Sequence, residues 1–397
     1  MNKHNNIGLL LSCWLGLSAV ASDCWAEEDI VWHGFLSQGL MQASKSNFVN
    51  DDGDISYRLT EAGINLSYQI NPSLRLASQV VYLNGGNRYP EGLRLDYLFL
   101  DWSVYTSDNW ELRLNLGRFK NYHWLYSSTR DIPHTRPSIV LPQSLYYDAF
   151  RDFAKGNDGL AALAQGDSRW GNWELNWSYG TTPIEKALTR TLLGEFATGE
   201  LEQVFDHQAS FYFQPKDSYS QFGIAMVSSD FRYKSGNADF FVDGDAGTRR
   251  WIASYKYSAE HWDLSMEAVQ EQLTYDNILF PGYYLNTYSQ GIYLQGRWFA
   301  SDALTLLGRI DMADMNKDDR SGAWLEQYSE GRIPRYFGYS DSLTLGMTYL
   351  LSENFALQAE VHRVKGTGRL SPAVVPNTAI NRSEYWNLWA VQLMYWF

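Results

Sequence analysis

Ten charged residues are concentrated between residues 118 and 158, and they are the strongest chemical signal in the chain. Six are basic and four are acidic: Arg118, Lys120, Arg130, Arg136, Arg151 and Lys155, against Asp131, Asp148, Asp152 and Asp158. The segment is therefore mildly basic, although the whole chain has a net charge of -13. Charges of both signs at a narrow passage create a transverse field that orients polar solutes and filters ions.

Further arginines occupy the polar side of predicted strands and could form a basic wall beside this segment. They are Arg75, Arg94, Arg113, Arg250 and Arg309. The alternative interpretation is that these arginines form salt bridges with acids of the same polar side, such as Glu111, Asp263 and Glu267. The sequence leaves both interpretations open.

Aromatic residues accompany the charges in the same segment. They are Tyr122, Trp124, Tyr126, Tyr146, Tyr147 and Phe150. These rings could stack on sugar rings while neighbouring charges bond the hydroxyls, which would indicate a substrate-specific sugar channel. The alternative is that the rings anchor the segment to its surroundings.

Catalytic chemistry has little support in the sequence. The seven histidines are scattered, and adjacent strand residues such as Asp206 and His207 point to opposite faces, so they would not form a direct pair. No Gly-x-Ser-x-Gly elbow occurs, and no His or Cys spacing suits a structural zinc. We therefore expect neither an enzyme nor a bound metal or cofactor.

The elements that position these residues are predicted by a recurring turn. A short polar cluster followed at once by an aromatic residue or leucine is typical of a hairpin connection, and it recurs seven times. The clusters lie at 71–74, 106–110, 166–170, 215–219, 258–262, 300–304 and 352–355. Long polar connections alternate with them, around 44–56, 84–92, 119–158, 181–204, 232–247, 275–288, 314–340 and 365–383. Seven turns and eight long connections predict about sixteen strands.

The segments between the connections alternate between apolar and polar residues. In residues 110–116, Trp110, Leu112, Leu114 and Leu116 alternate with Glu111, Arg113 and Asn115. Side chains of a strand alternate between its two sides, so the pattern predicts one apolar and one polar face. No apolar stretch beyond the N-terminal region reaches the ~18 to 20 residues that a spanning helix needs. We therefore predict an all-β, transmembrane antiparallel β-barrel of about sixteen strands.

The last strand carries a large apolar side chain at every second position. Trp389, Val391, Leu393, Tyr395 and Phe397 share one parity. A terminal Phe on such a strand resembles the C-terminal assembly signature of Gram-negative outer-membrane β-barrels. Aromatic residues make up 16% of the chain, and Tyr and Trp favour the membrane interface.

The long connection resembles a segment of the porin-like proteins of proteobacteria. The similar runs are residues 117–120, 129–137 and 142–144. At about forty residues the connection far exceeds an ordinary hairpin loop, and such loops are usually functional. It follows the fifth predicted strand, where sixteen-stranded porins fold their third loop into the lumen. The resemblance implies a constriction loop at about 119–158 in a passive diffusion channel for small hydrophilic solutes or ions. The mildly basic segment predicts a weak anion preference, because much of the acid of the chain lies in other long connections, such as residues 51–54 and 314–319.

The N-terminus has the pattern of a secretory signal peptide. Met1 to Lys3 precede an apolar run at residues 7–17, and small residues follow. Cleavage after Ala26 would remove both Cys13 and Cys24, while an earlier site at residues 19–21 ranks second. Asp23 before Cys24 disfavours a lipoprotein. The predicted organisation is a signal peptide at 1–26 and one barrel domain at 27–397.

The composition limits the partners. An acidic chain with a pI of about 5.0 has no basic patch large enough to hold a nucleic-acid backbone. The expected partners are outer-membrane lipid, lipopolysaccharide and small hydrophilic solutes. The resemblance to porins of this size implies a homotrimer, which is the assembly that we expect.

Overall fold

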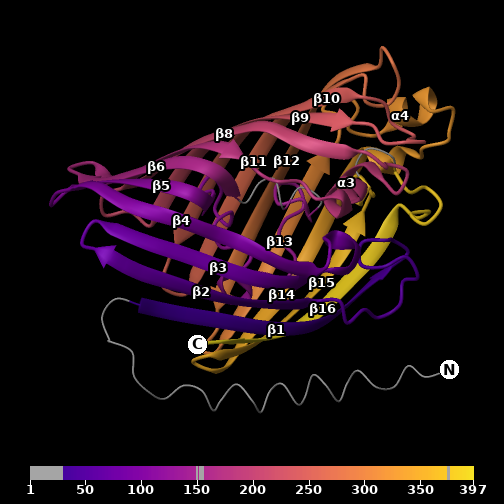
Figure 1. The fold of residues 1–397 in the computed structure, drawn as a ribbon. Helices are drawn as coiled ribbons and strands as arrows, with labels where there is room; N and C mark the ends of the chain where they lie inside the picture. The colour runs from indigo at the N-terminus through magenta and orange to yellow at the C-terminus, as the bar shows by residue number, and fades with distance from the viewer. Residues whose placement is uncertain (1–29, 149–150, 152–155, 373–375) are drawn as a thin grey trace, which may run out of the picture.

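A computed structural model of the chain describes residues 30–148, 151, 156–372 and 376–397. The predicted signal peptide lies outside these residues, as do Phe150, Asp152 and Lys155. The described chain forms one closed antiparallel barrel of sixteen strands, in which β1 pairs with both β2 and β16 (Figure 1). The predicted fold class is therefore confirmed.

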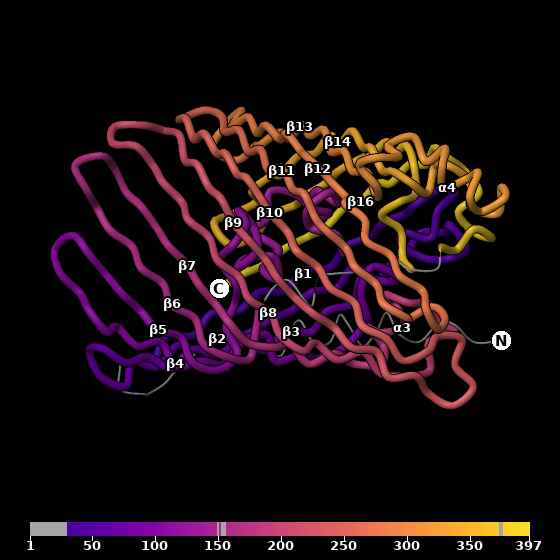
Figure 2. Tube along the Cα trace, turned by 90° about the horizontal axis from the view of Figure 1, so that it is seen from above, coloured from indigo at the N-terminus to yellow at the C-terminus, as the bar shows by residue number. Residues whose placement is uncertain are grey.

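The strands of the first half are β1 Ile30–Ser44, β2 Thr60–Asn71, β3 Leu74–Asn84, β4 Gly92–Thr106, β5 Trp110–Lys120, β6 Gly156–Ser168, β7 Gly171–Thr181 and β8 Glu200–Pro215. Those of the second half are β9 Ser220–Lys234, β10 Gly244–Ser258, β11 Trp262–Asp276, β12 Tyr284–Phe299, β13 Leu304–Asp314, β14 Tyr339–Ser352, β15 Phe355–Lys365 and β16 Tyr385–Trp396. They run obliquely side by side around the wall (Figure 2).

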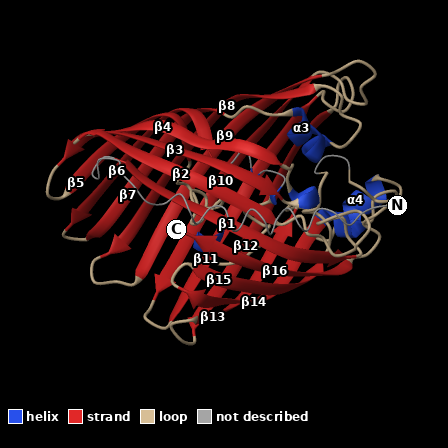
Figure 3. Ribbon diagram, turned by 60° about the horizontal axis from the view of Figure 1, so that its bottom comes forward, coloured by secondary structure: helices blue, strands red, loops and turns tan. Residues whose placement is uncertain are grey.

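The described connections are short at one end of the barrel and long at the other. The short ones are 72–73, 107–109, 169–170, 216–219, 259–261, 300–303 and 353–354, each within or beside a predicted turn cluster. The long end carries helices α3 Lys186–Leu193 and α4 Ala323–Tyr328, with the 3-10 turns η2 Gly86–Arg88 and η5 Arg335–Gly338. The 3-10 turn η3 Pro133–Thr135 instead lies near the last residue of β16, where His134 stacks on Trp396. Figure 3 shows α3 and α4 gathered at this end. No helix in the described part of the chain is both long and apolar enough to cross a membrane.

The two faces of the sheet differ as the alternation predicts. On β16, Tyr385 and Tyr395 are exposed on the outer face, whereas Trp386, Leu388 and Gln392 are buried on the inner face. An outward row of apolar and aromatic side chains suits lipid, and an inward row with polar groups suits a wet lumen.

The C-terminal residue closes the barrel. Phe397 exchanges two backbone hydrogen bonds with Gly34 of β1, at 3.1 and 3.0 Å, and its ring packs against Trp32 at a centroid distance of 5.4 Å. A Cβ atom at Gly34 would lie 2.4 Å from the Phe397 ring. The glycine therefore provides the space that the terminal aromatic residue needs.

Candidate functional site: the loop inside the barrel

Residues 121–148 leave β5 and lie inside the barrel, against the inner face of strands on the far side. Three carboxylates on distant strands accept hydrogen bonds from backbone N–H groups of this segment, which we call the lumen loop. The acceptors are Glu267 on β11 (from Leu125, 3.1 Å), Asp311 on β13 (from Gln143, 2.7 Å) and Glu360 on β15 (from Ile139, 2.9 Å, and Val140, 2.8 Å). The loop thus crosses the lumen and is held from the opposite wall.

Apolar contacts fix the same path. Trp124, Leu141, Leu145 and Tyr146 form one buried cluster with wall residues Ala225, Val227, Ile252, Val269 and Tyr293. Tyr146 also donates a hydrogen bond to Glu267 at 2.5 Å. Tyr147 is buried in a second cluster beneath α3. Among the described loop aromatics, these three therefore anchor the loop, and Tyr122 and Tyr126 retain more exposure.

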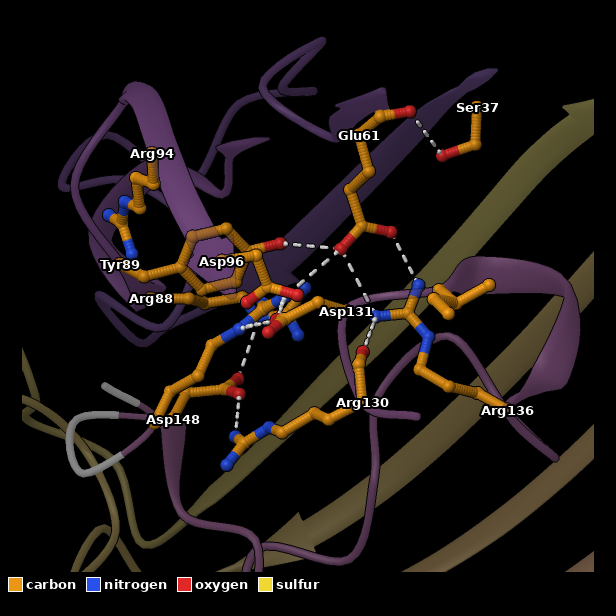
Figure 4. A network of polar contacts seen from close by, with 12 residues as sticks. Ser37, Glu61, Arg88, Tyr89, Arg94, Asp96, Arg130, Asp131, Arg136 and Asp148 are labelled. Atoms are coloured by element: carbon orange, nitrogen blue, oxygen red, sulfur yellow. Dashed lines mark hydrogen bonds and ion pairs between the residues drawn. The ribbon is translucent and has the colours of Figure 1, made fainter. Parts of the chain in front are cut away.

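A network of ion pairs joins the start and end of the loop to β2 and β4 (Figure 4). Asp131 is its centre, because Lys120 donates to it at 2.6 Å and Arg151 pairs with its other oxygen. Lys120 also pairs with Asp96 of β4 at 2.5 Å. Isolated charges are costly to bury, and these contacts offset that cost only while every partner is present.

Two further acids complete the network. Glu61 of β2 pairs with Arg136, and Tyr89 donates a hydrogen bond to the same carboxylate at 3.3 Å. Asp148 accepts from Arg88 at 2.7 Å and from Arg130 at 2.8 Å. Predicted site residues Lys120, Arg130, Asp131, Arg136, Asp148 and Arg151 are therefore brought together in one buried group.

The loop environment changes the ionisation of several groups. Burial alone raises the pKa of the Asp148 carboxyl, but Arg88 and Arg130 outweigh it and hold the pKa below its ordinary value. Burial lowers the pKa of Arg130. Burial also lowers the pKa of His123 to about 3, and its Nε2 lies 3.1 Å from the Ser178 hydroxyl of β7. His123 is therefore neutral in the folded loop at neutral pH.

The wall arginines differ in their partners. Arg250 donates to the Leu145 carbonyl at 3.1 Å, and Arg309 donates to the Val140 carbonyl at 2.8 Å, so both bind the lumen loop. Arg75 and Arg113 both pair with Asp101, at 2.5 and 3.4 Å, and stay partly accessible inside the barrel. Arg94 lies opposite Val81 at an inward-facing position of β4, and it donates a hydrogen bond to the Pro90 carbonyl at 2.6 Å.

The structure corrects the expected placement of Arg118. Its side chain lies on the outward face, where it makes two hydrogen bonds to Asp158, at 2.6 and 2.7 Å. Arg118 opposes the exposed Leu98 and continues the parity of Leu116, which is also exposed. Side chains of one parity share a face, so Arg118 does not line the lumen.

The sequence did not single out several acids that hold the site. They are Glu61, Asp96, Asp311 and Glu360. Each is a single acid at a strand position whose side chain points inward, and this alternation was the signal that the sequence offered. Their partners are distant in sequence, as with Arg136 and Glu61, which are 75 positions apart. In the described residues, no group of three or more His, Cys, Asp or Glu side chains could hold a metal ion.

Comparison with known proteins identifies the fold. No family model and no curated protein matches the sequence. Among solved structures, the trimer form of OmpT, an outer-membrane protein of Vibrio cholerae, is 14% identical, with 93% of this chain and 99% of that chain covered at a TM-score of 0.57. The anion-selective porin of Comamonas acidovorans is 11% identical, with 93% and 99% covered and a TM-score of 0.53. OmpF of Salmonella typhi is 12% identical, with 95% and 100% covered and a TM-score of 0.54. The chain therefore has the fold of the outer-membrane porins.

Proposed function

We propose that this porin-like barrel is an outer-membrane channel through which small hydrophilic solutes and ions diffuse, narrowed by the lumen loop. The observation that carries the proposal is the accessible charge inside the barrel. The side chains of Arg75, Arg113 and Arg297 are 40%, 30% and 29% exposed although they face inward. All three lie close to the short turns. Charged groups are left exposed only where water reaches them, so the lumen is open to water at this end, which supports the proposal.

The narrow region has a weak preference for anions. The network around Asp131 contains five cations and four carboxylates: Arg88, Lys120, Arg130, Arg136 and Arg151 against Glu61, Asp96, Asp131 and Asp148. The difference, five minus four, is a single positive charge. Such a small excess favours anions only slightly.

Planar-bilayer recordings test both parts of this proposal. The purified chain should conduct in discrete steps, and its reversal potential across a salt gradient should have the sign of slight anion preference. A clear cation preference would contradict the proposed anion preference but not the proposed channel. Absence of any conductance from correctly folded protein would overturn the channel itself.

Two acid–histidine pairs bear on the choice between diffusion and catalysis. Glu360 and His362 form a buried pair, 2.8 Å apart, but the Glu360 carboxylate also accepts the N–H groups of Ile139 and Val140, so this pair anchors the lumen loop.

The sequence neighbours Asp206 and His207 are divided by the wall. Asp206 faces inward, where Asn157 and Gln208 donate to its carboxylate. His207 faces outward and accepts from the Trp177 indole at 2.7 Å. A general base must lie within hydrogen-bond reach of its partner, and these two side chains are on opposite sides of the sheet. Absence of hydrolysis of lipid and peptide substrates by a conducting sample would support diffusion rather than catalysis.

The proposal places the chain in the outer membrane of a Gram-negative cell after removal of residues 1–26, in contact with lipid and lipopolysaccharide. A homotrimer is proposed as its assembly, supported by the trimer form of the similar OmpT structure. Mass determination of the purified protein in detergent tests the assembly. A strictly monomeric particle would contradict it.

A further inference from the structure

Inward side chains at the long end of β8 and β9 are shielded from water, in contrast to those at the short-turn end. Leu201 of β8 and Phe231 of β9 face inward, and both are buried. Arg75, Arg113 and Arg297, close to the short turns, face inward and stay partly exposed. A lumen that is open to water at both ends would leave inward side chains wet at both ends. The long end beside β8 and β9 is therefore covered.

Helix α3 supplies this cover. Three leucines on one side of the helix, Leu188, Leu192 and Leu193, are buried, whereas Lys186 and Ala187 on its other side are exposed. The leucines share one buried cluster with a residue of the lumen loop and with inward residues of the wall. These partners are Tyr147, Leu201, Phe231 and Tyr233. The helix therefore lies over the lumen loop with its apolar side toward the barrel interior.

The attachment of α3 is weaker than that of the lumen loop beneath it. In the described part of the chain, the hydrogen bonds of α3 stay within residues 185–194. Its one ion pair there joins Lys186 to Glu200 at 3.2 Å, with the side chains 67% and 60% exposed, and such pairs contribute little to stability. The lumen loop is instead held by buried carboxylates and buried ion pairs. Apolar contact is therefore the main attachment of α3, so the helix can leave while the loop stays in place.

The C-terminal end of α3 meets a second covering segment. Gly194 follows the helix with a φ of +111°, a conformation that favours glycine and suits a hinge. A Cβ atom at Gly194 would lie 3.6 Å from Pro372, so the helix ends against the last long connection. Tyr147 contacts both segments, because it packs with the leucines of α3 and its hydroxyl donates to the Leu370 carbonyl at 3.3 Å. The two segments therefore meet over the lumen loop.

We propose that α3 is a gate at the long end of the barrel, and that solutes pass beside β8 and β9 only when its leucines leave Tyr147. This inference rests on the proposed channel function and adds the regulation of that channel. The lumen loop sets the width of the passage, whereas α3 sets how often the passage is open. Because apolar contact holds the closed state, making one of the leucines polar favours the open state.

Single-channel recording in planar bilayers distinguishes a gate from a constriction. Leu192→Ser should shorten the closed periods about tenfold, because serine loses most of the apolar contact that keeps α3 closed. The conductance step should keep the size that it has in the parent chain, since the lumen loop is unchanged. Ala187→Ser is the matched control, because Ala187 lies on the exposed side of the same helix, and this change should alter neither quantity.

Thiol labelling measures the movement of α3 without conduction. Both cysteines of the chain lie in the predicted signal peptide, so the chain without residues 1–26 and with Leu201→Cys carries a single thiol, in the cluster beneath α3. A charged, water-soluble maleimide should react with this thiol in the folded protein about tenfold faster when Leu192→Ser is also present. Ala187→Ser should leave the labelling rate unchanged.

Leu188→Ala, a milder change on the same side of α3, takes the place of Leu192→Ser if that variant does not fold. Equal closed periods or equal labelling rates in the parent chain and the folded variant would overturn the gate. A larger conductance step with unchanged closed periods would also overturn it, because α3 would then be part of the constriction. Faster labelling without conductance from any of these proteins would overturn the channel and leave α3 as a movable cover, whereas conductance with equal closed periods would leave the channel without this gate.

Discussion

A single carboxylate of the lumen loop, Asp131, pairs with the two cations that flank the loop. Lys120 reaches it from the end of β5 and Arg151 from the far end of the loop, and all three side chains are buried. Arg151 also lies over the Tyr89 ring, 4.2 Å from its centroid. Removing one partner of such a buried group leaves the others with uncompensated charge, which is more destabilising than the loss of a surface pair.

Asp131→Asn should therefore loosen the lumen loop by about 3 kcal/mol, because Lys120 and Arg151 lose their shared carboxylate. Hydrogen exchange of residues 121–148, followed by mass spectrometry, measures the change. Asp245→Asn is the control, because Asp245 is 61% exposed and its pair with Arg232 should contribute little. Equal protection of the loop in all three proteins would contradict this role for Asp131.

Acid should loosen the loop in two steps. His123 has its pKa lowered from 6.5 to about 3 by burial, so its neutral form stabilises the folded loop fully above pH 6.5 and progressively less down to about 3. Asp148 has a pKa below its ordinary value of 3.8. The charged carboxylate therefore stabilises the loop fully above pH 3.8, and this stabilisation is lost as the pH falls further. Exchange protection of the loop should fall first between pH 6.5 and 4.

The His123→Gln variant separates the contribution of His123 to loop stability from that of Asp148. Glutamine does not titrate, so this variant should lose less loop protection than the parent chain between pH 6.5 and about 4. The same early loss of protection in the parent chain and in the variant would show that His123 is not responsible.

At the scale of elements, closure of the barrel depends on the contact between β1 and the end of the chain. Gly34→Val should push the Phe397 ring out of its place and destabilise the barrel by about 1 to 3 kcal/mol, the usual cost of overpacking. Thermal unfolding of the purified protein measures the cost. Gly92→Val is the control, because a Cβ atom there has no neighbour within 4 Å. An unchanged melting temperature for Gly34→Val would contradict the packing argument.

The strands and turns could be predicted because their signals are local. Alternation and turn residues depend on neighbours within a few positions, and the described strands confirm both. The polar contacts of the lumen loop could not be predicted, since hydrogen-bonded partners such as Arg309 and Ser138 are 171 positions apart. Arg118 is different, because the alternation of Leu112, Leu114 and Leu116 in the sequence already indicates that its side chain faces outward.

At the scale of the whole molecule, the lumen loop is the one long connection that the described contacts place across the interior. It is bound by carboxylates on β11, β13 and β15 and by the ion pairs to β2 and β4. The wall closes by its own strand pairs, without the loop. Removing the loop should therefore widen the passage and leave the barrel intact.

The most direct test compares single-channel conductance in planar bilayers for the parent chain and for a variant with residues 124–147 replaced by a short Gly-Ser link. We predict discrete conductance steps for both proteins and larger steps for the variant, because the link removes the segment that crosses the lumen. Equal steps for the two folded proteins, or no conductance from either, would contradict a channel narrowed by this loop.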